Sequence, residues 1–251
     1  MDWPEFEQTW AQEASHWWFV ARKQLALALL NHWVCLGPDS RILDVGCGTG
    51  GNLMWLAHLG RVQGLDLSPI AIHFSRRRAE CPLAQASALA VPYPDDSFDL
   101  VTAFDVLYHR WIEDDSQVAA EMWRVLRPGG WLLLTDAALP VLWSRHDELF
   151  YARQRYTLAT IRDKLVQAGF EPRVSSYTNF LLLPFVTLIR ILENRRRNRQ
   201  AVERGWSLPG WLNGLLIGVR RLETGWLQRQ QRLPIGSSIV CLSEKRGGQG
   251  R

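Results

Sequence analysis

The stretch LDVGCGTGGN, residues 43–52, decides the fold of this chain. The apolar run at 41–45 has the composition of a parallel strand that is buried on both faces. Four glycines follow within six positions, at 46, 48, 50 and 51. Glycine has no Cβ, so its backbone can turn sharply and can also lie directly against a ligand. The stretch therefore predicts a strand, a ligand-binding turn and a helix, in that order.

Outside this stretch, apolar runs alternate with segments of helical periodicity. Further strands are expected at 61–68, 83–86, 97–104, 131–136, 171–177 and 237–244. Helices are expected within 5–34, at 52–58, from 69 onward, at 113–126 before the RPGG sequence, and at 157–169. This alternation predicts an α/β fold with a doubly wound, mostly parallel seven-stranded sheet.

The 251 residues are expected to form one domain, divided into four parts. These are an N-terminal helical lid (1–38), a ligand-binding core (39–177), a basic helical insertion (178–234), and the last strand with its tail (235–251). The insertion is too long for a plain connection. Its apolar side chains at Leu208, Leu212, Leu215, Val219, Leu222 and Trp226 are spaced for one helix face, with Asn213, Arg220 and Arg221 off it.

Charge is distributed unevenly along the chain. Residues 1–172 carry 15 basic and 21 acidic side chains, whereas 173–251 carry 14 basic and 4 acidic ones. Such a basic part usually faces an anionic partner. The four cysteines lack the spacing of metal ligands, so no metal site is expected. The acidic N-terminus has no apolar signal segment, which favours a cytoplasmic location.

The glycine motif is compatible with two kinds of ligand. Gly46, Gly48 and Gly51 satisfy G-x-G-x-x-G, and Asp66 follows Gly46 by twenty residues. This is the fingerprint of a dinucleotide site, so an NAD-dependent oxidoreductase is one alternative. The motif alone does not distinguish a dinucleotide from a smaller nucleoside.

Five motifs together favour the nucleoside. ILDVGCGTGGN (42–52), GLDLSP (64–69), VPYPDDSFDLV (91–101), DVLYH (105–109) and RVLRPGGWLLLTD (124–136) resemble, in order and spacing, the class I S-adenosylmethionine-dependent methyltransferases. The resemblance covers about residues 16–177 and is strongest to the small-molecule group that includes quinone-biosynthesis enzymes. HWWFVARK (16–23) and DELFYARQRYT (147–157) resemble a bacterial subgroup.

The resemblance implies S-adenosylmethionine as cofactor and assigns a role to each motif. Asp44 would attract the positively charged methionine part, and Asp66 would accept hydrogen bonds from both ribose hydroxyls. The turn residues Gly46, Cys47, Gly48 and Gly50 would pass against the ligand, and Leu67 would lie along the adenine. Ser87 and Ala88 stand where the family commonly has an Asp-Ala pair, and Asp105 begins its D-x-x-x-H ending.

On the acceptor side, the candidates to remove a proton are His109, His146 and Asp147. Tyr151, Arg153 and Tyr156 are candidate positioning groups, and Tyr156 is also a candidate catalytic residue. Arg153 or Arg155 could hold an acidic or phosphate-bearing acceptor. An imidazole could orient or deprotonate an acceptor. His109 could equally be structural, and 147–157 could be an ordinary surface helix.

The lid and the insertion carry the remaining expectations. Trp17, Trp18 and Phe19 are consecutive, so they do not share one helix face and some must meet a second surface. The apolar run at 180–189 is too short to span a bilayer and contains Pro184. It fits peripheral contact with an anionic inner-membrane surface, or else a cap over the site with solvated arginines. The acceptor is expected to be a small or lipid-linked molecule.

Two other functions remain open. Nucleic acid is disfavoured as a partner because no N-P-P-Y-like base-methylating signature is present. A membrane-associated module that binds a nucleoside without turnover is the non-enzymatic alternative.

Overall fold

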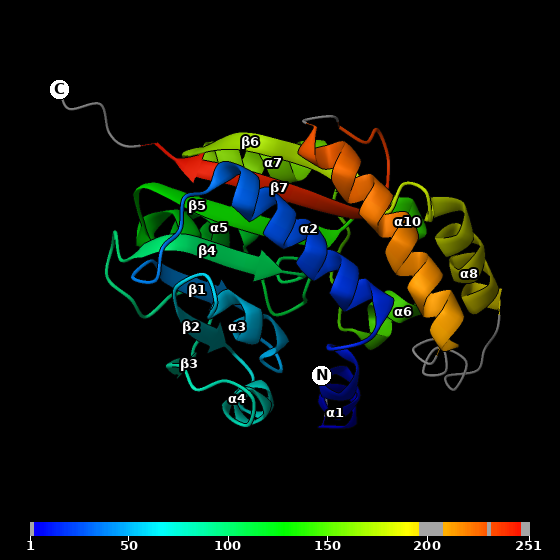
Figure 1. Cartoon of the computed structure of the whole chain (residues 1–251), viewed down its shortest axis with the longest axis horizontal. Helices are drawn as coiled ribbons and strands as arrows, with labels where there is room; N and C mark the ends of the chain where they lie inside the picture. Colours follow the sequence, from blue (N-terminus) through cyan, green and yellow to red (C-terminus); the bar gives the residue numbers. More distant parts are fainter. Residues whose placement is uncertain (1–2, 196–207, 230–231, 247–251) are drawn as a thin grey trace.

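The seven strands of the protein form one sheet in the order β3-β2-β1-β4-β5-β7-β6 (Figure 1). The structure is a computed structural model that describes residues 3–195, 208–229 and 232–246. The strands are β1 (Arg41–Val45), β2 (Arg61–Asp66), β3 (Leu83–Gln85), β4 (Phe98–Phe104), β5 (Leu126–Ala137), β6 (Phe170–Thr178) and β7 (Ser238–Lys245). The first five strands are parallel, and β7 is antiparallel to both of its neighbours. The predicted doubly wound, mostly parallel sheet is confirmed.

The strand order places a crevice above β1 and β4. From β1 the chain runs outward through β2 and β3 on one side, and through β4 and β5 on the other. Ligands of open α/β sheets bind at such a switch point, beyond the carboxyl ends of the strands. The glycine turn after β1 and the residues after β4 both lie at this edge.

Helices cover both faces of the sheet. They are α1 (Trp3–Gln12), α2 (Trp17–Trp33), α3 (Gly51–Leu56), α4 (Pro69–Arg76), α5 (Asp115–Val125), α6 (Arg145–Leu149), α7 (Leu158–Gln167), α8 (Leu183–Arg195) and α10 (Gly210–Gln228). Side chains of α2, α3 and α10 pack with one face of the strands, and those of α5 and α7 with the other. Both faces of the sheet are therefore covered, which explains why the central strands β4 and β5 are rich in apolar residues.

Helix α2 is apolar around most of its circumference because it is enclosed on two sides. Leu25, Leu29 and Leu30 are buried within the core. On its other side α10 runs beside it, as Figure 1 shows. The backbone N–H of Trp17 donates to Asn213 Oδ1 at 2.7 Å, which fixes the start of α2 against α10. The N-terminal helix and the late insertion thus form one unit over the sheet.

The boundary between α5 and β5 differs from the sequence expectation. The RPGG sequence was expected to separate a helix ending at 126 from a strand starting at 131. In the structure β5 already begins at Leu126, which pairs with Phe98, and the register then shifts before Leu100 pairs with Trp131. Gly129, at φ 79°, lies within this irregular stretch. The RPGG sequence is therefore an irregular beginning of the strand.

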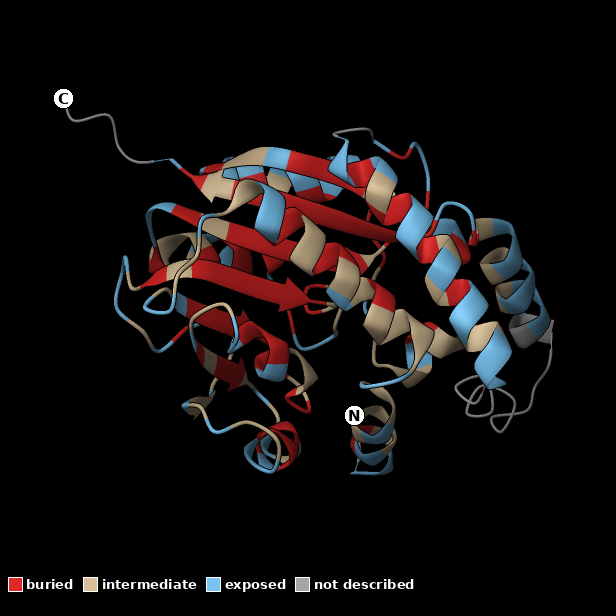
Figure 2. Ribbon diagram, viewed as in Figure 1, coloured by how far each residue is buried: buried red, intermediate tan, exposed pale blue. Residues whose placement is uncertain are grey.

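The insertion between β6 and β7 contains α8 and α10, and α10 faces the core with an unexpected side. Leu216, Leu227 and the polar residues Arg220 and Glu223 are buried, whereas Leu215, Leu222 (70% exposed) and Trp226 of the predicted stripe point outward. The other members of the stripe, Leu208, Leu212 and Val219, are half-buried. Figure 2 shows the exposed outer surface of this helix in pale blue. The expectation that the arginines of this helix are solvated is wrong for Arg220.

A buried acid explains this orientation. Glu223 forms an ion pair with Arg220, and its carboxylate accepts hydrogen bonds from the backbone N–H groups of Asn179 at 2.9 Å and Leu181 at 2.7 Å. Buried charges are retained where they are paired and hydrogen-bonded. Glu223 thereby anchors the chain segment that leads into α8, and α10 must turn this side inward.

Candidate active site

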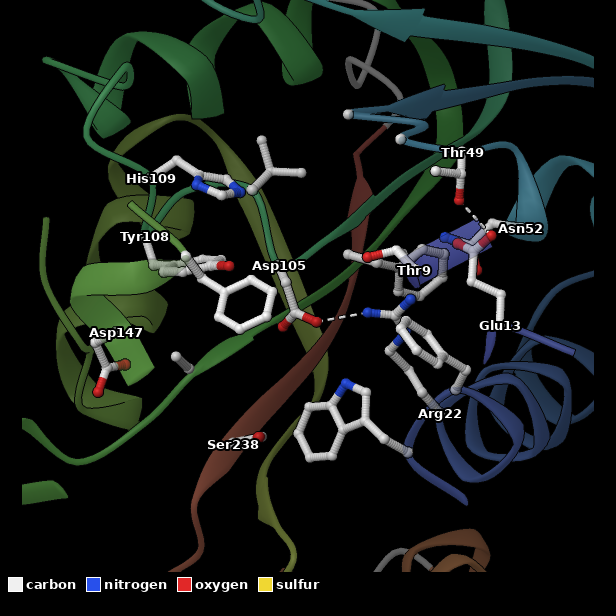
Figure 3. Close-up of a pocket in the computed structure, with 18 of the residues that line it drawn as sticks. Thr9, Glu13, Arg22, Thr49, Asn52, Asp105, Tyr108, His109, Asp147 and Ser238 are labelled. Atoms are coloured by element: carbon white, nitrogen blue, oxygen red, sulfur yellow. Dashed lines mark hydrogen bonds and ion pairs between the residues drawn. The ribbon is translucent and has the colours of Figure 1, made fainter. Parts of the chain in front are cut away.

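A cavity of about 740 Å³ lies at the carboxyl ends of β1, β2 and β4. One end is lined by the glycine turn and by residues that follow β2, and the other by residues of α6 and α8. Residues of α1 and α2 line it as well. Figure 3 shows side chains from these separate elements pointing into the same space. The cavity is therefore large enough for two small molecules held side by side.

The glycine turn lines one end of the cavity without side chains. Gly46 has φ 70°, and a Cβ there would lie 2.6 Å from a methyl carbon of Val106. Gly48 has φ 56°, and a Cβ there would meet no atom within 4 Å. Only glycine adopts both conformations at little cost. The open space at Gly48 is a cradle in which a ligand can approach the backbone. Cys47 also lines the cavity, whereas Gly50 does not.

Asp66 is held in place at the end of β2. Its Oδ2 accepts the backbone N–H of Gly48 at 2.9 Å, and its Oδ1 accepts that of Ser68 at 2.8 Å. Burial raises the pKa of this carboxyl, while the same two hydrogen bonds act in the opposite direction. Each carboxylate oxygen keeps further acceptor capacity. Asp66 lines the cavity and is thus a fixed double acceptor beside the glycine turn.

Leu67, Ser87 and Ala88 line the cavity next to Asp66. Leu67 is 48% exposed, which is unusual for a leucine and indicates an apolar surface available to a flat ligand. Ser87 Oγ already accepts the backbone N–H of Leu89 at 3.1 Å, so the serine also shapes its own turn.

Asp44 lies beneath the cavity and is completely buried. Its Oδ1 accepts a hydrogen bond from the hydroxyl of Thr102 at 2.6 Å, and its Oδ2 has no partner among the described residues. Burial raises the pKa of Asp44 to about 7, although the Thr102 bond favours the ionised form. An unsatisfied buried carboxylate oxygen is costly, and a nearby cation or a bridging water would stabilise it.

An ion pair that the sequence analysis missed crosses the middle of the cavity. Arg22 of α2 donates from Nη1 to Asp105 Oδ2 at 2.5 Å, as the dashed line in Figure 3 marks. The guanidinium lies 5.4 Å from the ring centroid of Phe19 and 5.2 Å from that of Phe104. Asp105 was predicted as a site residue, and it does line the cavity. Its arginine partner comes from the lid, 83 residues earlier.

A second missed contact links the turn after α1 to the glycine turn. Glu13 accepts hydrogen bonds from the Thr49 hydroxyl and from Arg78. A Cβ on Gly51 would lie 2.6 Å from the carboxyl carbon of Glu13, so the two segments are in close contact. Burial raises the pKa of Glu13. In the sequence Glu13 was one acid among several in an acidic segment, and no motif singled it out.

His109 lines the acceptor side of the cavity as a neutral imidazole. Burial lowers its pKa to about 4, although interactions with the backbone of Tyr151 and Phe150 favour its charged form. Its Nδ1 has no hydrogen-bond partner among the described residues. The ring stacks on Tyr108 with centroids 4.3 Å apart. A neutral imidazole with such a low pKa is a weak base, and its Nδ1 atom is buried.

His146 also lines the cavity, whereas Tyr156 does not. The Tyr156 hydroxyl is buried and donates to Asp115 Oδ2 at 2.6 Å. The assignment of Tyr156 to the acceptor side is therefore corrected to a structural role. The same applies to Arg153, which bonds the carbonyl of Glu113 at 2.8 Å and is absent from the cavity lining.

Residues 147–157 do not form a surface helix. Helix α6 ends at Leu149, and Ala152 forms an isolated bridge with His109. Arg155 is buried, lines the cavity and donates from Nε to Asp147 Oδ1 at 2.8 Å. Trp17, Trp18 and Phe19 all line the cavity, so the second surface expected for these rings is the cavity itself.

Comparisons with known proteins agree with this geometry. Residues 43–134 match the family described as "Methyltransferase domain". The chain is 43% identical to the fatty-acid O-methyltransferase of Mycolicibacterium smegmatis over 105 residues, which are 39% of this chain and 37% of the relative. It is 33% identical to a probable S-adenosylmethionine-dependent methyltransferase of the same organism over 161 residues, 62% of this chain and 60% of the relative. The chain thus spans about a third to three fifths of the length of these relatives.

A solved structure shares the fold. The geranyl diphosphate C-methyltransferase of Streptomyces coelicolor, in complex with Mg²⁺, geranyl diphosphate and S-adenosylhomocysteine, superposes with a TM-score of 0.59 at 16% identity. The match covers 89% of this chain and 80% of that one. The domain match and the relatives thus place a methyltransferase-like sequence over the glycine turn and the strands β1 to β5, and the solved structure shows that the whole sheet has the methyltransferase fold.

Proposed function

We propose that the protein transfers the methyl group of S-adenosylmethionine to a small or lipid-linked acceptor bound in the apolar part of the cavity. One observation carries the proposal: a single cavity joins the glycine turn and Asp66 at one end to an apolar wall from the insertion at the other. The methyltransferase domain match supports this reading over a dinucleotide site.

The residues at the glycine end fit the cofactor. The cradle at Gly48 accommodates a ligand against the backbone, and Asp66 offers two acceptors for the two ribose hydroxyls. Leu67 and Ala88 provide the apolar surface for adenine. The unsatisfied Oδ2 of Asp44 supplies negative charge below the cavity, which suits the positively charged methionine part.

When bound, S-adenosylmethionine supplies a methyl group that is attached to a positively charged sulfur. The sulfide is a good leaving group and needs no protonation. The protein therefore has to align the two reactants and exclude water. Helices α1 and α2 serve the second purpose because Phe6, Trp17 and Trp18 line the cavity from the lid side. His109 lines the cavity, and its low pKa keeps the imidazole uncharged at neutral pH.

The wall of the cavity formed by the insertion suits an apolar acceptor. Leu182, Phe185, Val186 and Ile189 of the insertion line the cavity there. One relative, matched over 39% of this chain, is named for methylating a fatty acid, which agrees with an apolar body. We therefore place a lipid-like acceptor between α8 and the Arg22–Asp105 pair.

The insertion also offers a surface for a membrane. Trp211, Leu215, Leu222 and Trp226 are between 52% and 73% exposed, and their spacing puts them on one side of α10. None of the helices in the described part of the chain is long and apolar enough to cross a bilayer. An exposed apolar stripe beside a basic sequence suits contact with anionic headgroups. We propose that a lipid-linked acceptor reaches the cavity from such a surface, at the cytoplasmic side of the inner membrane.

The cofactor assignment is tested by titrating S-adenosylhomocysteine into the protein in a calorimeter. Asp66→Ala removes both ribose acceptors and is expected to weaken binding by about tenfold or more, since charged hydrogen bonds contribute ~1.5–3 kcal/mol each. Asp163→Asn, in the exposed part of α7, is the matched control and is expected to bind like the wild type. Equal affinity of Asp66→Ala and wild type would place the cofactor elsewhere.

A further inference from the structure

The proposed cofactor, S-adenosylmethionine, ends in an amino acid that carries an ammonium and a carboxylate. The acids around the glycine turn suit the ammonium and the sulfonium, but they repel the carboxylate. Glu13 and Asp66 line this end of the cavity, and Asp44 is buried beneath it. A carboxylate that is removed from water needs a paired cation or several hydrogen-bond donors. Some group of this chain therefore has to pair with it.

Three arginines of the described residues line the cavity, and Arg22 is the one that lies beside the glycine turn. Arg155 bonds Asp147 of α6, and Arg190 belongs to α8, and these two helices line the other end of the cavity. The histidines that line the cavity are uncharged at neutral pH, because burial lowers the pKa of each one. Arg22 is thus the cation that a ligand against the glycine turn would meet.

The position of Arg22 beside the turn follows from its effect on the neighbouring acids. Burial raises the pKa of Asp44 and of Glu13, and the charge of Arg22 counteracts this rise in each carboxyl. Asp44 lies just before the turn, and Glu13 accepts a hydrogen bond from Thr49 within it. In Figure 3 the guanidinium of Arg22 lies between Asp105 and Glu13. Its positive charge is therefore close to the backbone against which the cofactor is proposed to lie.

The guanidinium of Arg22 has unused donors. Its Nη1 donates to Asp105 Oδ2 at 2.5 Å, and this is the one hydrogen bond that it makes within the described part of the chain. A guanidinium has five N–H groups in a planar fork, and two of them can bind a carboxylate side by side. The rings of Phe19 and Phe104 flank it, with centroids at 5.4 and 5.2 Å. Because Arg22 lines the cavity, the remaining N–H groups are within reach of a ligand.

We propose that Arg22 binds the carboxylate of the cofactor's methionine part through the N–H groups that Asp105 leaves free. The inference rests on the proposed function, since it adds a residue to the site of that cofactor. One guanidinium then holds two carboxylates, one at the end of β4 and one on the ligand. The lid helix α2 thereby recognises the amino-acid end of the cofactor. A lysine would not replace this arginine, because an ammonium is a point charge without a planar fork.

The test compares two ligands that share the adenosine, the thioether and the ammonium. S-adenosylhomocysteine also carries the carboxylate, whereas its decarboxylated analogue lacks it. Each is titrated into the full-length protein in a calorimeter. The readout is the ratio of the two dissociation constants, because a general disturbance of the lid weakens both ligands alike and leaves the ratio unchanged. The wild type is expected to bind S-adenosylhomocysteine more tightly than the analogue.

Arg22→Gln is the decisive variant, because it removes the charge and the fork but keeps an amide donor. The preference for S-adenosylhomocysteine over the analogue is expected to fall about tenfold or more, as for the loss of a charged hydrogen bond. Lys23→Gln is the matched control and should keep the wild-type ratio. It removes the same charge from the same helix, but Lys23 is exposed and does not line the cavity.

A double variant, Arg22→Gln with Asp105→Asn, protects the test against misfolding. Arg22→Gln alone leaves the carboxylate of Asp105 without its partner, which is costly for a buried charge. The double variant has no such charge, and it is expected to show the same fall in the preference for S-adenosylhomocysteine.

The outcomes separate this inference from the proposed function. Normal S-adenosylhomocysteine binding by the wild type, with an unchanged ratio in both variants of Arg22, would overturn the role of Arg22 and leave the proposed function standing. A wild type that binds the analogue as tightly as S-adenosylhomocysteine would overturn it too, because the carboxylate would then contribute nothing. No S-adenosylhomocysteine binding by the wild type would instead remove the methyltransferase proposal on which this inference rests.

Discussion

Asp44 shows how a single buried residue links stability to ligand binding. One carboxylate oxygen of Asp44 accepts a hydrogen bond from the Thr102 hydroxyl. The other has no partner among the described residues. Its pKa rises from a usual 3.8 to about 7 because of burial. The folded protein therefore holds a proton that the unfolded chain has already lost between these two pH values. It follows that Asp44 makes the protein less stable as pH rises through this window.

Asp44→Asn removes this dependence because an amide does not ionise. The variant is expected to gain stability over the wild type between pH 5 and pH 7, by about 1.4 kcal/mol per pH unit at most, with no further gain above pH 7. Urea unfolding at a series of pH values measures this, with Asp163→Asn as an exposed control. At pH 8 Asp44→Asn is also expected to bind S-adenosylhomocysteine more weakly. Parallel stability curves for variant and wild type would contradict the buried-carboxylate account.

Individual site residues differ in how visible they are in the sequence. Gly46, Gly48 and Asp66 stand in a local motif of strand, turn and strand, so their positions in the cavity followed from spacing alone. Arg22 reaches the site from α2 and Glu13 from the turn between α1 and α2, and their partners lie 83 and 36 residues away. No pattern in one sequence specifies such distant pairs. Tyr156 was predicted as a site residue, but its hydroxyl donates a hydrogen bond to the buried carboxylate of Asp115.

Among the elements, α10 shows the limit of periodicity. The spacing of Leu215, Leu222 and Trp226 correctly indicated one face of a helix, but it did not indicate where that face points. The direction is set by Glu223, which must reach two backbone N–H groups near Asn179, and by its pairing with Arg220. Leaving these groups unsatisfied would cost more than exposing leucines. Leu215, Leu222 and Trp226 are therefore left exposed.

The exposed stripe of α10 gives a prediction about membranes. Replacing Trp211, Leu215 and Trp226 together by Ser is expected to reduce cosedimentation with vesicles of phosphatidylglycerol and phosphatidylcholine by about tenfold or more at low salt, because apolar insertion is lost. Val166→Ser, which is 50% exposed in the wild type on α7, serves as the control. The membrane proposal is abandoned if the wild type stays in the supernatant, or if the triple variant sediments as well as the wild type does.

At the scale of the whole molecule, the mostly parallel seven-stranded sheet was predictable, because each βα unit carries its own local signals, whereas the order of its strands comes from the structure. The way in which helices cover the site was less predictable. The lid contacts α10 through Trp17 and Asn213, which are 196 residues apart. The N-terminal helices and the late insertion thus form the cover together. Only the folded chain shows that the two segments line one cavity.

The most direct test of methyl transfer follows a labelled methyl group from S-adenosylmethionine into a fractionated cell extract. The account predicts label in an amphiphilic, organic-soluble fraction with the wild type and almost none with Asp66→Ala. Label confined to water-soluble compounds would contradict the apolar acceptor. No label in any fraction, from a wild type that demonstrably binds S-adenosylhomocysteine, would contradict the central claim and leave a nucleoside-binding module without turnover.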